Sequence, residues 1–301
     1  MRDAGGAPGY FARMKLIRSV EEMQQAAMAV RRAGRRIALV PTMGALHEGH
    51  AALIRKAREQ GAAVAVSIYV NPTQFGPKED FKQYPRDIDA DSGLCVRESV
   101  DVVFVPSDTE IYPGGLGDDD FIDQTSTWVE ETTFTKRLEA ERRPAHFRGV
   151  CTVVAKLFNI VRPNVAVFGQ KDYQQFKVVQ RMVRDLCYPI ELVLTPTVRE
   201  PDGLALSSRN RYLSPDERIQ ATVLWKALNT AQDLFNEGER NSHRLETAMI
   251  RTVQLAHRAR LDYVEIADVE TLEPVVEAKR GNIALLAVHI GKTRLIDNLI
   301  L

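Results

Sequence analysis

The sequence predicts an α/β protein with a doubly wound parallel sheet, followed by a smaller C-terminal α+β domain. Over the first two thirds of the chain, short apolar runs alternate with helical patterns, as in parallel sheets with right-handed crossovers. Beyond that point, helices come first and strands follow. The 301 residues, 45% of them hydrophobic, suffice for one large domain or two of ordinary size.

Each element of the first part has its own signal. Residues 19–34 are predicted to form a helix, with Ser19 as its N-cap and Gly34 at its end. Uninterrupted apolar runs are typical of strands buried on both faces of a parallel sheet. They predict strands at residues 37–40, 62–70, 101–106, 164–168 and 190–194. Further helices are expected at residues 50–60, 150–161 and 173–186.

The pattern changes near residue 200. Ser214 as N-cap, with Pro215 and Glu217 behind it, predicts a helix start. This long helix should run to about residue 238 and a second one should cover residues 242–259. Strands are expected at 261–267 and 283–290, with a short strand or turn at 293–301. We therefore expect a loose extension at 1–13, a Rossmann-like domain at 14–195 and a smaller α+β lid domain at 196–301.

Composition disfavours several classes of protein. The 40 basic and 40 acidic residues balance, whereas a nucleic-acid binder usually shows a basic excess. The three cysteines (Cys95, Cys151 and Cys187) are far apart and lack CxxC spacing, so we expect no disulfide framework or zinc site. No apolar run approaches the length of a membrane span, and the N-terminus lacks the core of a signal peptide. We expect a cytoplasmic protein.

The most informative stretch is the turn His47-Glu48-Gly49-His50, which lies between a predicted strand and a predicted helix. A helix start exposes unpaired backbone N–H groups and a positive dipole end, which favour an anion. Two imidazoles three positions apart lie on one helix face and can add donors to a phosphate. The alternative is one structural and one solvent-facing histidine. A metal site is less favoured, because no third ligand is evident.

Two further motifs begin where predicted strands end, the position at which doubly wound sheets bind ligands. Asn71 and Gln74 are neutral groups suited to a hydroxyl or carboxylate, although an Asn-Pro turn is the alternative. After the strand at 164–168, Lys171 suits a phosphate, and Asp172 could cap a helix or hold a ribose hydroxyl. The alternative there is a capped helix with an exposed lysine.

A fourth motif, residues 204–212, sets Ser207 and Ser208 beside Arg209, a dense group of phosphate donors. A solvated basic loop is the alternative. Residues 143–149 add a basic, aromatic loop before the helix at 150–161. No nucleophile with an adjacent base and no paired carboxylates stand out. This combination favours positioning and charge stabilisation over a covalent enzyme intermediate.

The chain resembles the pantoate–β-alanine ligase family over roughly residues 14–301. The resemblance rests on five ordered motifs, PTMGALHEGH (41–50), VNPTQFG (70–76), RPAHFRGV (143–150), FGQKDYQQ (168–175) and LALSSRNRYL (204–213). It implies the fold of the HxGH nucleotidylyl transferase superfamily. It also implies a two-step reaction in which ATP converts (R)-pantoate to pantoyl adenylate and pyrophosphate. β-Alanine then gives pantothenate and AMP. Mg²⁺ would accompany ATP, and a homodimer through the larger domain is implied.

The resemblance also implies site residues. The ATP-binding positions are Met43, Gly44, Ala45, Leu46, His47, Glu48, Gly49, His50, Gly169, Gln170, Lys171, Asp172, Val198, Leu206, Ser207, Ser208 and Arg209. Of these, His50, His47, Lys171, Ser207, Ser208 and Arg209 are expected to be catalytic. Gln74, Gln175, Asn71 and Arg143 match positions for pantoate or β-alanine. No metal ligand is assigned, and Asp87, Asp89 and Asp91 have no firm role.

Gln170 stands where the family often has Glu, and Leu206 where it often has Met. We expect neither to abolish activity, since both are close in volume to the residues they replace. The competing hypotheses are another nucleotidylyl transferase on the same fold and a nucleotide-binding module without turnover. A protein similar to tRNA synthetases is disfavoured by the neutral charge and the small second half.

Overall fold

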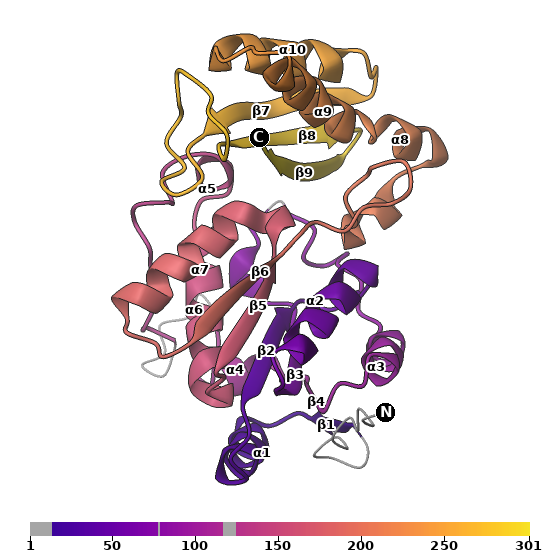
Figure 1. Ribbon diagram of the computed structural model, residues 1–301. Helices are drawn as coiled ribbons and strands as arrows, with labels where there is room; N and C mark the ends of the chain where they lie inside the picture. The colour runs from indigo at the N-terminus through magenta and orange to yellow at the C-terminus, as the bar shows by residue number, and fades with distance from the viewer. Residues whose placement is uncertain (1–13, 78, 117–124) are drawn as a thin grey trace, which may run out of the picture. The chain divides into compact units, whose positions relative to one another are not determined.

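The computed structural model describes residues 14–77, 79–116 and 125–301, so the predicted extension at 1–13 lies outside the described residues (Figure 1). The chain divides into two compact units. The first holds the described residues up to Thr135, with Ala140–Phe168 and Val178–Thr195. The second holds Lys136–Glu139, Gly169–Lys177 and Pro196–Leu301. The chain therefore passes repeatedly between the units.

The first unit is built on a six-stranded sheet with the order β1-β4-β3-β2-β5-β6. Its strands are β1 (Lys15–Ile17), β2 (Ile37–Thr42), β3 (Ala63–Ile68), β4 (Val102–Phe104), β5 (Val165–Gly169) and β6 (Glu191–Thr195). The pairings β1–β4, β4–β3, β3–β2 and β2–β5 are parallel. This confirms the predicted α/β class. The three-residue strand β1 was not predicted, because it is too short to show a pattern.

Helices alternate with these strands along the chain (Figure 1). They are α1 (Val20–Arg32), α2 (Glu48–Glu59), α3 (Ile88–Arg97), α4 (Asp108–Ile111), α5 (Glu139–Arg142), α6 (His146–Val161) and α7 (Tyr173–Asp185). Ser19 caps α1 as predicted, since its hydroxyl accepts the N–H of Glu22 at 3.3 Å. Helix α6 begins four residues before the predicted start at 150, because Ala145 in the left-handed region (φ 67°) turns the chain into the helix at His146.

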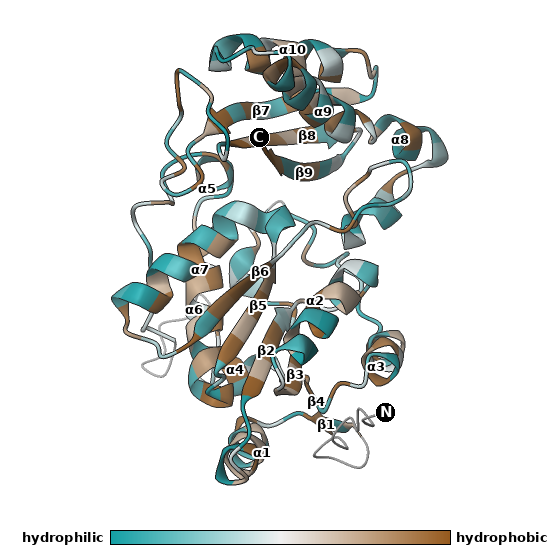
Figure 2. Cartoon of the chain, in the orientation of Figure 1, coloured by the Kyte–Doolittle hydropathy of each residue, from teal (hydrophilic) through white to brown (hydrophobic). Residues whose placement is uncertain are grey.

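The strands carry the apolar core, visible as brown arrows in Figure 2. Ala38 and Val40 of β2 pack in one cluster with Ala51, Ile54 and Ala57 of α2. Side chains alternate along a strand, so the intervening Leu39, fully buried, faces the opposite side of the sheet. Helices α1 and α6, which pack on each other, also contact β2. Burial on both faces explains why the strands were predictable as continuous apolar runs.

The second unit has a three-stranded antiparallel sheet with the order β7-β8-β9. Its further elements are β7 (Ala259–Ala267), β8 (Ile283–Ile290), β9 (Thr293–Ile300), α8 (Pro215–Gln220), α9 (Val223–Asn236) and α10 (Ser242–Gln254). Its buried core includes Leu245 and Met249 of α10 together with Leu286 and Val288 of β8. Together with the first unit's sheet, this unit confirms the predicted class of a parallel-sheet core with a small α+β part.

Two predictions in this half were wrong. The single helix expected from Ser214 to about residue 238 is interrupted between α8 and α9, where the Thr222 hydroxyl donates to the Ile219 carbonyl. Its start is correct, since Ser214 and Glu217 form a reciprocal capping box. Helix α10 ends at Gln254 instead of residue 259, because the chain from Ala259 pairs with β8.

Gly149 in α6 lies so close to the neighbouring backbone that a larger residue there should lower the free energy of unfolding. A Cβ there would lie 2.3 Å from the Thr73 carbonyl oxygen, which belongs to the short 3-10 helix η1 (Pro72–Gln74). Gly149→Ala should therefore destabilise the fold by about 1–3 kcal/mol, since backbone must shift. Thermal or urea unfolding measures the change.

The matched control is Gly93→Ala in α3, where the nearest atom to an added Cβ is the Arg97 guanidinium at 3.6 Å. Relief of glycine's entropy cost should stabilise this variant by about 0.5–1 kcal/mol. Equal stabilisation by both substitutions would show that η1 is not held against α6 as described.

Candidate functional site

The turn after β2 is shaped by a buried carboxylate from α3. Gly44 and Ala45 both adopt left-handed backbone conformations, with φ of 82° and 51°. The carboxylate of Asp91 accepts the N–H of Ala45 at 3.0 Å and that of Leu46 at 2.7 Å. Asp91 is only 3% exposed. A fixed negative charge thus fills the donor concavity of this turn, and gives Asp91 a role that the sequence did not reveal.

The two histidines cap the start of α2 with the same ring atom. His47 is the N-cap, and its Nδ1 accepts the N–H of Gly49 at 3.2 Å. Nδ1 of His50 accepts the N–H of His47, also at 3.2 Å. The ring centroids lie 4.2 Å apart. A neutral imidazole that accepts at Nδ1 carries its proton on Nε2, so both rings have Nε2–H donors.

This arrangement changes the expected way in which an anion is bound. The helix start was predicted to offer unpaired backbone N–H groups, but those of Ala45, Leu46, His47 and Gly49 donate to side chains. Besides its backbone groups, the turn carries the imidazole rings of His47 and His50, whose Nδ1 atoms both accept a backbone N–H. These rings suit a phosphate, because the backbone bonds at Nδ1 constrain both ring orientation and tautomer.

A buried amide holds the side chain of Gln74. Asn71, with no exposed surface, donates from Nδ2 to Gln74 Oε1 at 3.0 Å and to the Gly149 carbonyl at 3.1 Å. Its Oδ1 accepts the Tyr112 hydroxyl at 2.9 Å. Burial raises the pKa of Tyr112, which keeps that hydroxyl protonated as a donor. With its oxygen engaged, Gln74 has an NH₂ group to offer an acceptor on a ligand.

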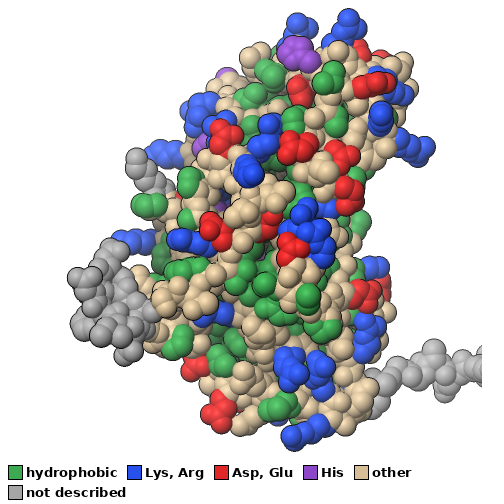
Figure 3. All heavy atoms as spheres, turned by 90° about the vertical axis from the view of Figure 1, so that its left-hand side faces the viewer, with side chains coloured by type: hydrophobic (Ala, Val, Ile, Leu, Met, Phe, Trp, Pro, Cys, Tyr) green, Lys and Arg blue, Asp and Glu red, His purple; other side chains and the backbone are tan. Residues whose placement is uncertain are grey.

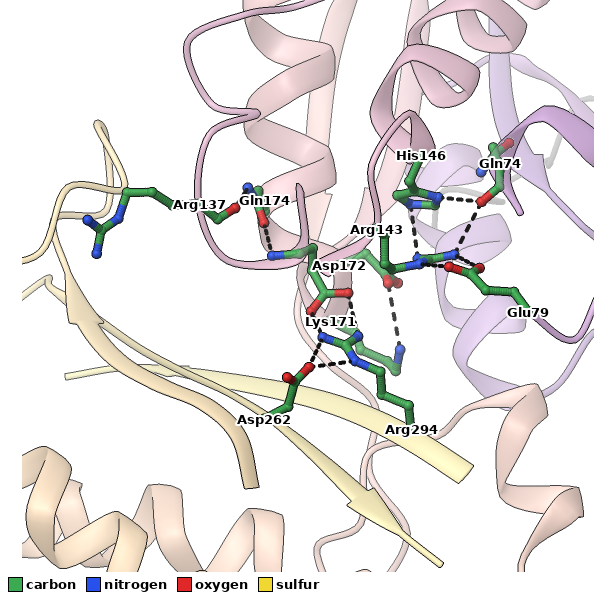
Figure 4. A network of polar contacts seen from close by, with 11 residues as sticks. Gln74, Glu79, Arg137, Arg143, His146, Lys171, Asp172, Gln174, Asp262 and Arg294 are labelled. Carbon is green, nitrogen blue, oxygen red and sulfur yellow. Dashed lines mark hydrogen bonds and ion pairs between the residues drawn. The ribbon is translucent and has the colours of Figure 1, made fainter. Parts of the chain in front are cut away.

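Arg143 supports the same glutamine from its main-chain side (Figure 4). Its guanidinium binds Glu79 through two bonds of 2.9 and 2.7 Å and donates to the Gln74 carbonyl at 3.3 Å. Nδ1 of His146 lies 2.8 Å from that carbonyl, so it must be the donor. His146 therefore has the opposite tautomer to His47 and His50. The Arg143 charge is already paired with a carboxylate, which favours a supporting role.

In the second unit, the segment after β5 is fixed by strand β9. Gln170–Asp172 form a 3-10 turn (η2) that leads into α7. Asn298 of β9 donates to the carbonyls of Gln170 and Lys171 at 2.9 and 3.0 Å. The Lys171 ammonium lies 3.7 Å from the carboxylate of Asp172. Gln175 follows on α7 and is partly buried.

The predicted serine-rich loop is an ordered hairpin and turn. The N–H of Leu206 donates to the Val198 carbonyl at 3.0 Å, which brings these two predicted positions together. The Ser207 hydroxyl accepts the N–H of Arg209 at 3.3 Å and caps the 3-10 helix η3 (Ser208–Tyr212). Ser208 is buried and Arg209 is partly buried. A freely solvated loop, the alternative considered above, does not describe this segment.

The predicted residues thus form two groups, one in each unit. The first unit holds Met43–His50, Asn71, Gln74 and Arg143, and the second holds Gly169–Asp172, Gln175, Val198 and Leu206–Arg209. Sequence reasoning missed the residues that support them, Asp91, Glu79, Tyr112 and Asn298. Their partners are distant along the chain and share no motif with them, so no local signal could have identified them.

Burial and charge argue against several other kinds of functional site. Burial raises the pKa of the thiols of Cys95 and Cys151 to about 12, so neither is a thiolate nucleophile near neutral pH. Within the described ranges, no group of three or more His, Cys, Asp or Glu could hold a metal ion. On the face drawn in Figure 3, basic and acidic side chains are interspersed. None of the described helices is long and apolar enough to cross a membrane.

Comparison with known proteins extends over nearly the whole chain. Residues 15–300 match the family model described as pantoate-beta-alanine ligase. A pantothenate synthetase from Thermotoga neapolitana is 53% identical over 96% of this chain and 100% of its own length. A crystal structure of pantothenate synthetase from Thermus thermophilus has a TM-score of 0.88 at 42% identity, covering 95% of this chain and 99% of that one.

A further similar structure is the pantoate-beta-alanine ligase of Francisella tularensis, described as complexed with beta-gamma ATP and beta-alanine. It has a TM-score of 0.76 at 33% identity and covers 95% of this chain and 97% of its own. These similarities cover both units and every motif identified in the sequence.

The buried carboxylate of Asp91 gives a prediction for the turn after β2. Asp91→Asn replaces one acceptor oxygen by an NH₂ group that faces a backbone N–H, so the variant should lose about 1–3 kcal/mol of stability. Amide hydrogen exchange should also accelerate at Ala45 and Leu46. Asp101→Asn is the control, because Asp101 accepts the N–H of Val64 through Oδ2 and an amide oxygen can replace it. Unchanged protection at both amides in Asp91→Asn would refute the role given to this carboxylate.

Proposed function

This chain belongs to the pantoate–β-alanine ligase family and is an ATP-dependent ligase that joins pantoate to β-alanine, and from that premise we propose how its residues carry out the reaction. The pantoate carboxylate attacks the α-phosphorus of ATP and pyrophosphate leaves. The amine of β-alanine then attacks the acyl carbon of pantoyl adenylate, and AMP leaves.

The chemical difficulty is charge. An anionic nucleophile must approach a polyanionic triphosphate, so fixed donors aimed at the phosphate oxygens should supply the largest catalytic contribution. The observation that carries our proposal is that Nδ1 of both His47 and His50 accepts a backbone N–H. A neutral ring with this contact carries its proton on Nε2, and we propose that Nε2–H donates to the phosphate oxygens when ATP binds. We assign His47 to the phosphates, and His50 to the pentavalent centre or the leaving pyrophosphate.

The remaining ATP contacts are assigned to segments in both units. In the first unit, Met43–His50 form the turn that receives the nucleotide. In the second, Gly169–Asp172, Val198 and Leu206–Arg209 bind it, with Lys171, Ser207, Ser208 and Arg209 holding the β- and γ-phosphates. A lysine point charge beside hydroxyl and guanidinium donors suits these oxygens. The Ser207 cap on η3 supports this assignment by ordering the loop.

Mg²⁺ is proposed to enter with ATP. This ion keeps several waters and is commonly bound by substrate phosphates with one or two carboxylates. We assign no residue of the chain to the metal, and the phosphates of ATP would supply its ligands together with water. When bound, Mg²⁺ would neutralise part of the phosphate charge.

Pantoate and β-alanine are assigned to neutral polar groups. The NH₂ group of Gln74, oriented by Asn71, would donate to the pantoate carboxylate or hydroxyl oxygens and to β-alanine. Gln175 is the second pantoate ligand. Arg143 orients Gln74 through its carbonyl, since its own charge is paired with Glu79. We assign no general base to the second step, which relies on positioning of the β-alanine amine and on the adenylate leaving group.

We propose a cytoplasmic homodimer formed through the larger unit, and this proposal rests on the resemblance to the family. The free thiols of Cys95, Cys151 and Cys187 are compatible with a reducing compartment. Sedimentation equilibrium should give twice the chain mass of 33.8 kDa. A sharp monomer mass at micromolar concentration would contradict the dimer.

The role of His50 is tested by His50→Ala. Loss of one preorganised donor should lower pantoate-dependent ATP–pyrophosphate exchange about 10²- to 10³-fold while leaving the fold intact. His243→Ala, an exposed histidine on α10, is the control and should exchange at the parental rate. An exchange rate in His50→Ala close to that of the control would exclude the assignment.

The role of Gln175 is tested by the effect of its substitution on the KM for pantoate. Gln175→Ala should raise the KM for pantoate about tenfold, because a hydrogen bond to a charged group is worth about 1.5–3 kcal/mol. The KM for ATP should change little. Gln180→Ala on the same helix is exposed and serves as the control. If pantoate saturation is the same in both variants, Gln175 is not a pantoate ligand.

A further inference from the structure

Strand β9 carries two consecutive buried polar residues that the reaction chemistry does not use. Asp297 and Asn298 are 3% and 2% exposed. Burial of a charged group and an amide side by side is costly unless their hydrogen bonds are satisfied. Their partners are Gln170 and Lys171, which we assign to ATP, and Arg199, which follows the assigned Val198.

Asn298 uses both polar atoms of its side chain. Its Nδ2 donates to the carbonyls of Gln170 and Lys171 at 2.9 and 3.0 Å. Its Oδ1 accepts from Nε2 of Gln170 at 3.2 Å. Its main-chain carbonyl accepts from the Arg199 guanidinium at 3.2 Å. Two carbonyl acceptors fix the orientation of the amide, and the amide in turn fixes the backbone that carries the Lys171 side chain.

Asp297 holds the second segment in the same way. Its two carboxylate oxygens accept from Arg199 at 2.6 and 2.9 Å, and Oδ1 also accepts the Asn298 N–H at 2.8 Å. The Arg199 guanidinium lies over the Trp225 ring, 3.8 Å from its centroid, and donates to the Gly203 carbonyl at 3.1 Å. Arg199 pairs with Ala205 in the hairpin in which the N–H of Leu206 donates to the Val198 carbonyl.

Gly203 shows how closely this hairpin packs against Trp225. Its φ of +91° favours glycine, and a Cβ there would lie 1.8 Å from Trp225 Cδ1. The indole that stacks on Arg199 therefore also packs against the tip of the hairpin. The hairpin is held at its base by Asp297 and at its tip by Trp225, while the neighbouring residue on β9 holds the Lys171 segment.

We propose that Asp297 and Asn298 are positioning residues for ATP, which tie the Gln170–Lys171 backbone and the hairpin leading to Ser207–Arg209 into one frame. Neither side chain touches the nucleotide. The inference rests on the proposed function, because it requires that these two segments bind ATP. The side chain of Gln170 joins the same frame, because its Nε2 donates to Asn298 Oδ1 at 3.2 Å.

The test is Asn298→Asp in the full-length enzyme. The substitution keeps the shape but sets a carboxylate against two carbonyl oxygens, so the Lys171 backbone should shift. Small misplacements can cost up to about 100-fold, so we expect kcat/KM for ATP to fall about 10- to 100-fold. The KM for pantoate should stay within about twofold, since Gln74 is held by a separate network.

The matched control is Asn229→Asp on α9, where Nδ2 also donates to a main-chain carbonyl, that of Trp225, at 3.0 Å. It should reproduce any general loss of stability without the ATP effect. Equal ATP kinetics in the two variants would overturn the proposal. If Asn298→Asp fails to fold, Asn298→Ala replaces it, because it also removes both bonds to the Gln170 and Lys171 carbonyls, and an unchanged KM for ATP in that variant would count equally against the proposal.

Lys171→Ala distinguishes a failure of the ATP assignment from a failure of the positioning role proposed for Asn298. If it leaves ATP binding unchanged, the assignment of this segment to ATP is wrong and the proposed function must be revised. If it weakens ATP binding while Asn298→Asp does not, only the positioning role fails. A large effect of both variants on ATP, with parental saturation by pantoate, is the result expected.

Discussion

The central constraint on this structure is that the hydrogen-bond donors for the phosphates of ATP must be fixed in position before ATP binds. A flexible donor loses rotational freedom when it binds, and that loss offsets part of the electrostatic gain. Here each important donor is fixed because its other hydrogen-bonding atoms are already occupied. His47 and His50 bind backbone N–H groups through Nδ1, and Asn71 holds the oxygen of Gln74. Hydrogen bonds that define the fold therefore also set the direction of the remaining donors.

The same device recurs in both units with different partners. In the first unit, a carboxylate from α3 fills the turn after β2, and the Arg143–Glu79 pair supports Gln74. In the second unit, Asn298 holds the backbone around Lys171, and Asp297 holds Arg199. The buried carboxylates recruited for structure are satisfied by a guanidinium, as at Asp297, or by backbone N–H groups, as at Asp91, since an unsatisfied buried charge is costly. For the phosphates of ATP, we propose the ammonium of Lys171, the guanidinium of Arg209 and the imidazoles of His47 and His50.

Much of the fold followed from the sequence because its strands are buried on both faces. The run at residues 62–70 leaves little choice but a central strand, and the Ser214–Glu217 pair marks a helix start. The break between α8 and α9 and the early end of α10 depend on tertiary packing and strand pairing, which outweigh local helical preference. For the site, the motifs identified the residues proposed to face the substrates. The sequence could not reveal Asp91, Tyr112 or Asn298, because each acts on a backbone or amide group far away along the chain.

The central claim, that the fold fixes these donors in advance, is tested most directly by the tautomeric state of the histidines in the enzyme without ligand. Nitrogen-15 NMR of histidine-labelled protein, at a pH where the rings are neutral, distinguishes a protonated Nδ1 from a protonated Nε2. We expect His47 and His50 to carry the proton on Nε2, and His146, which donates from Nδ1 to the Gln74 carbonyl, to show the opposite state. Rapid exchange between tautomers at His47 and His50, or protonation at their Nδ1, would contradict the claim.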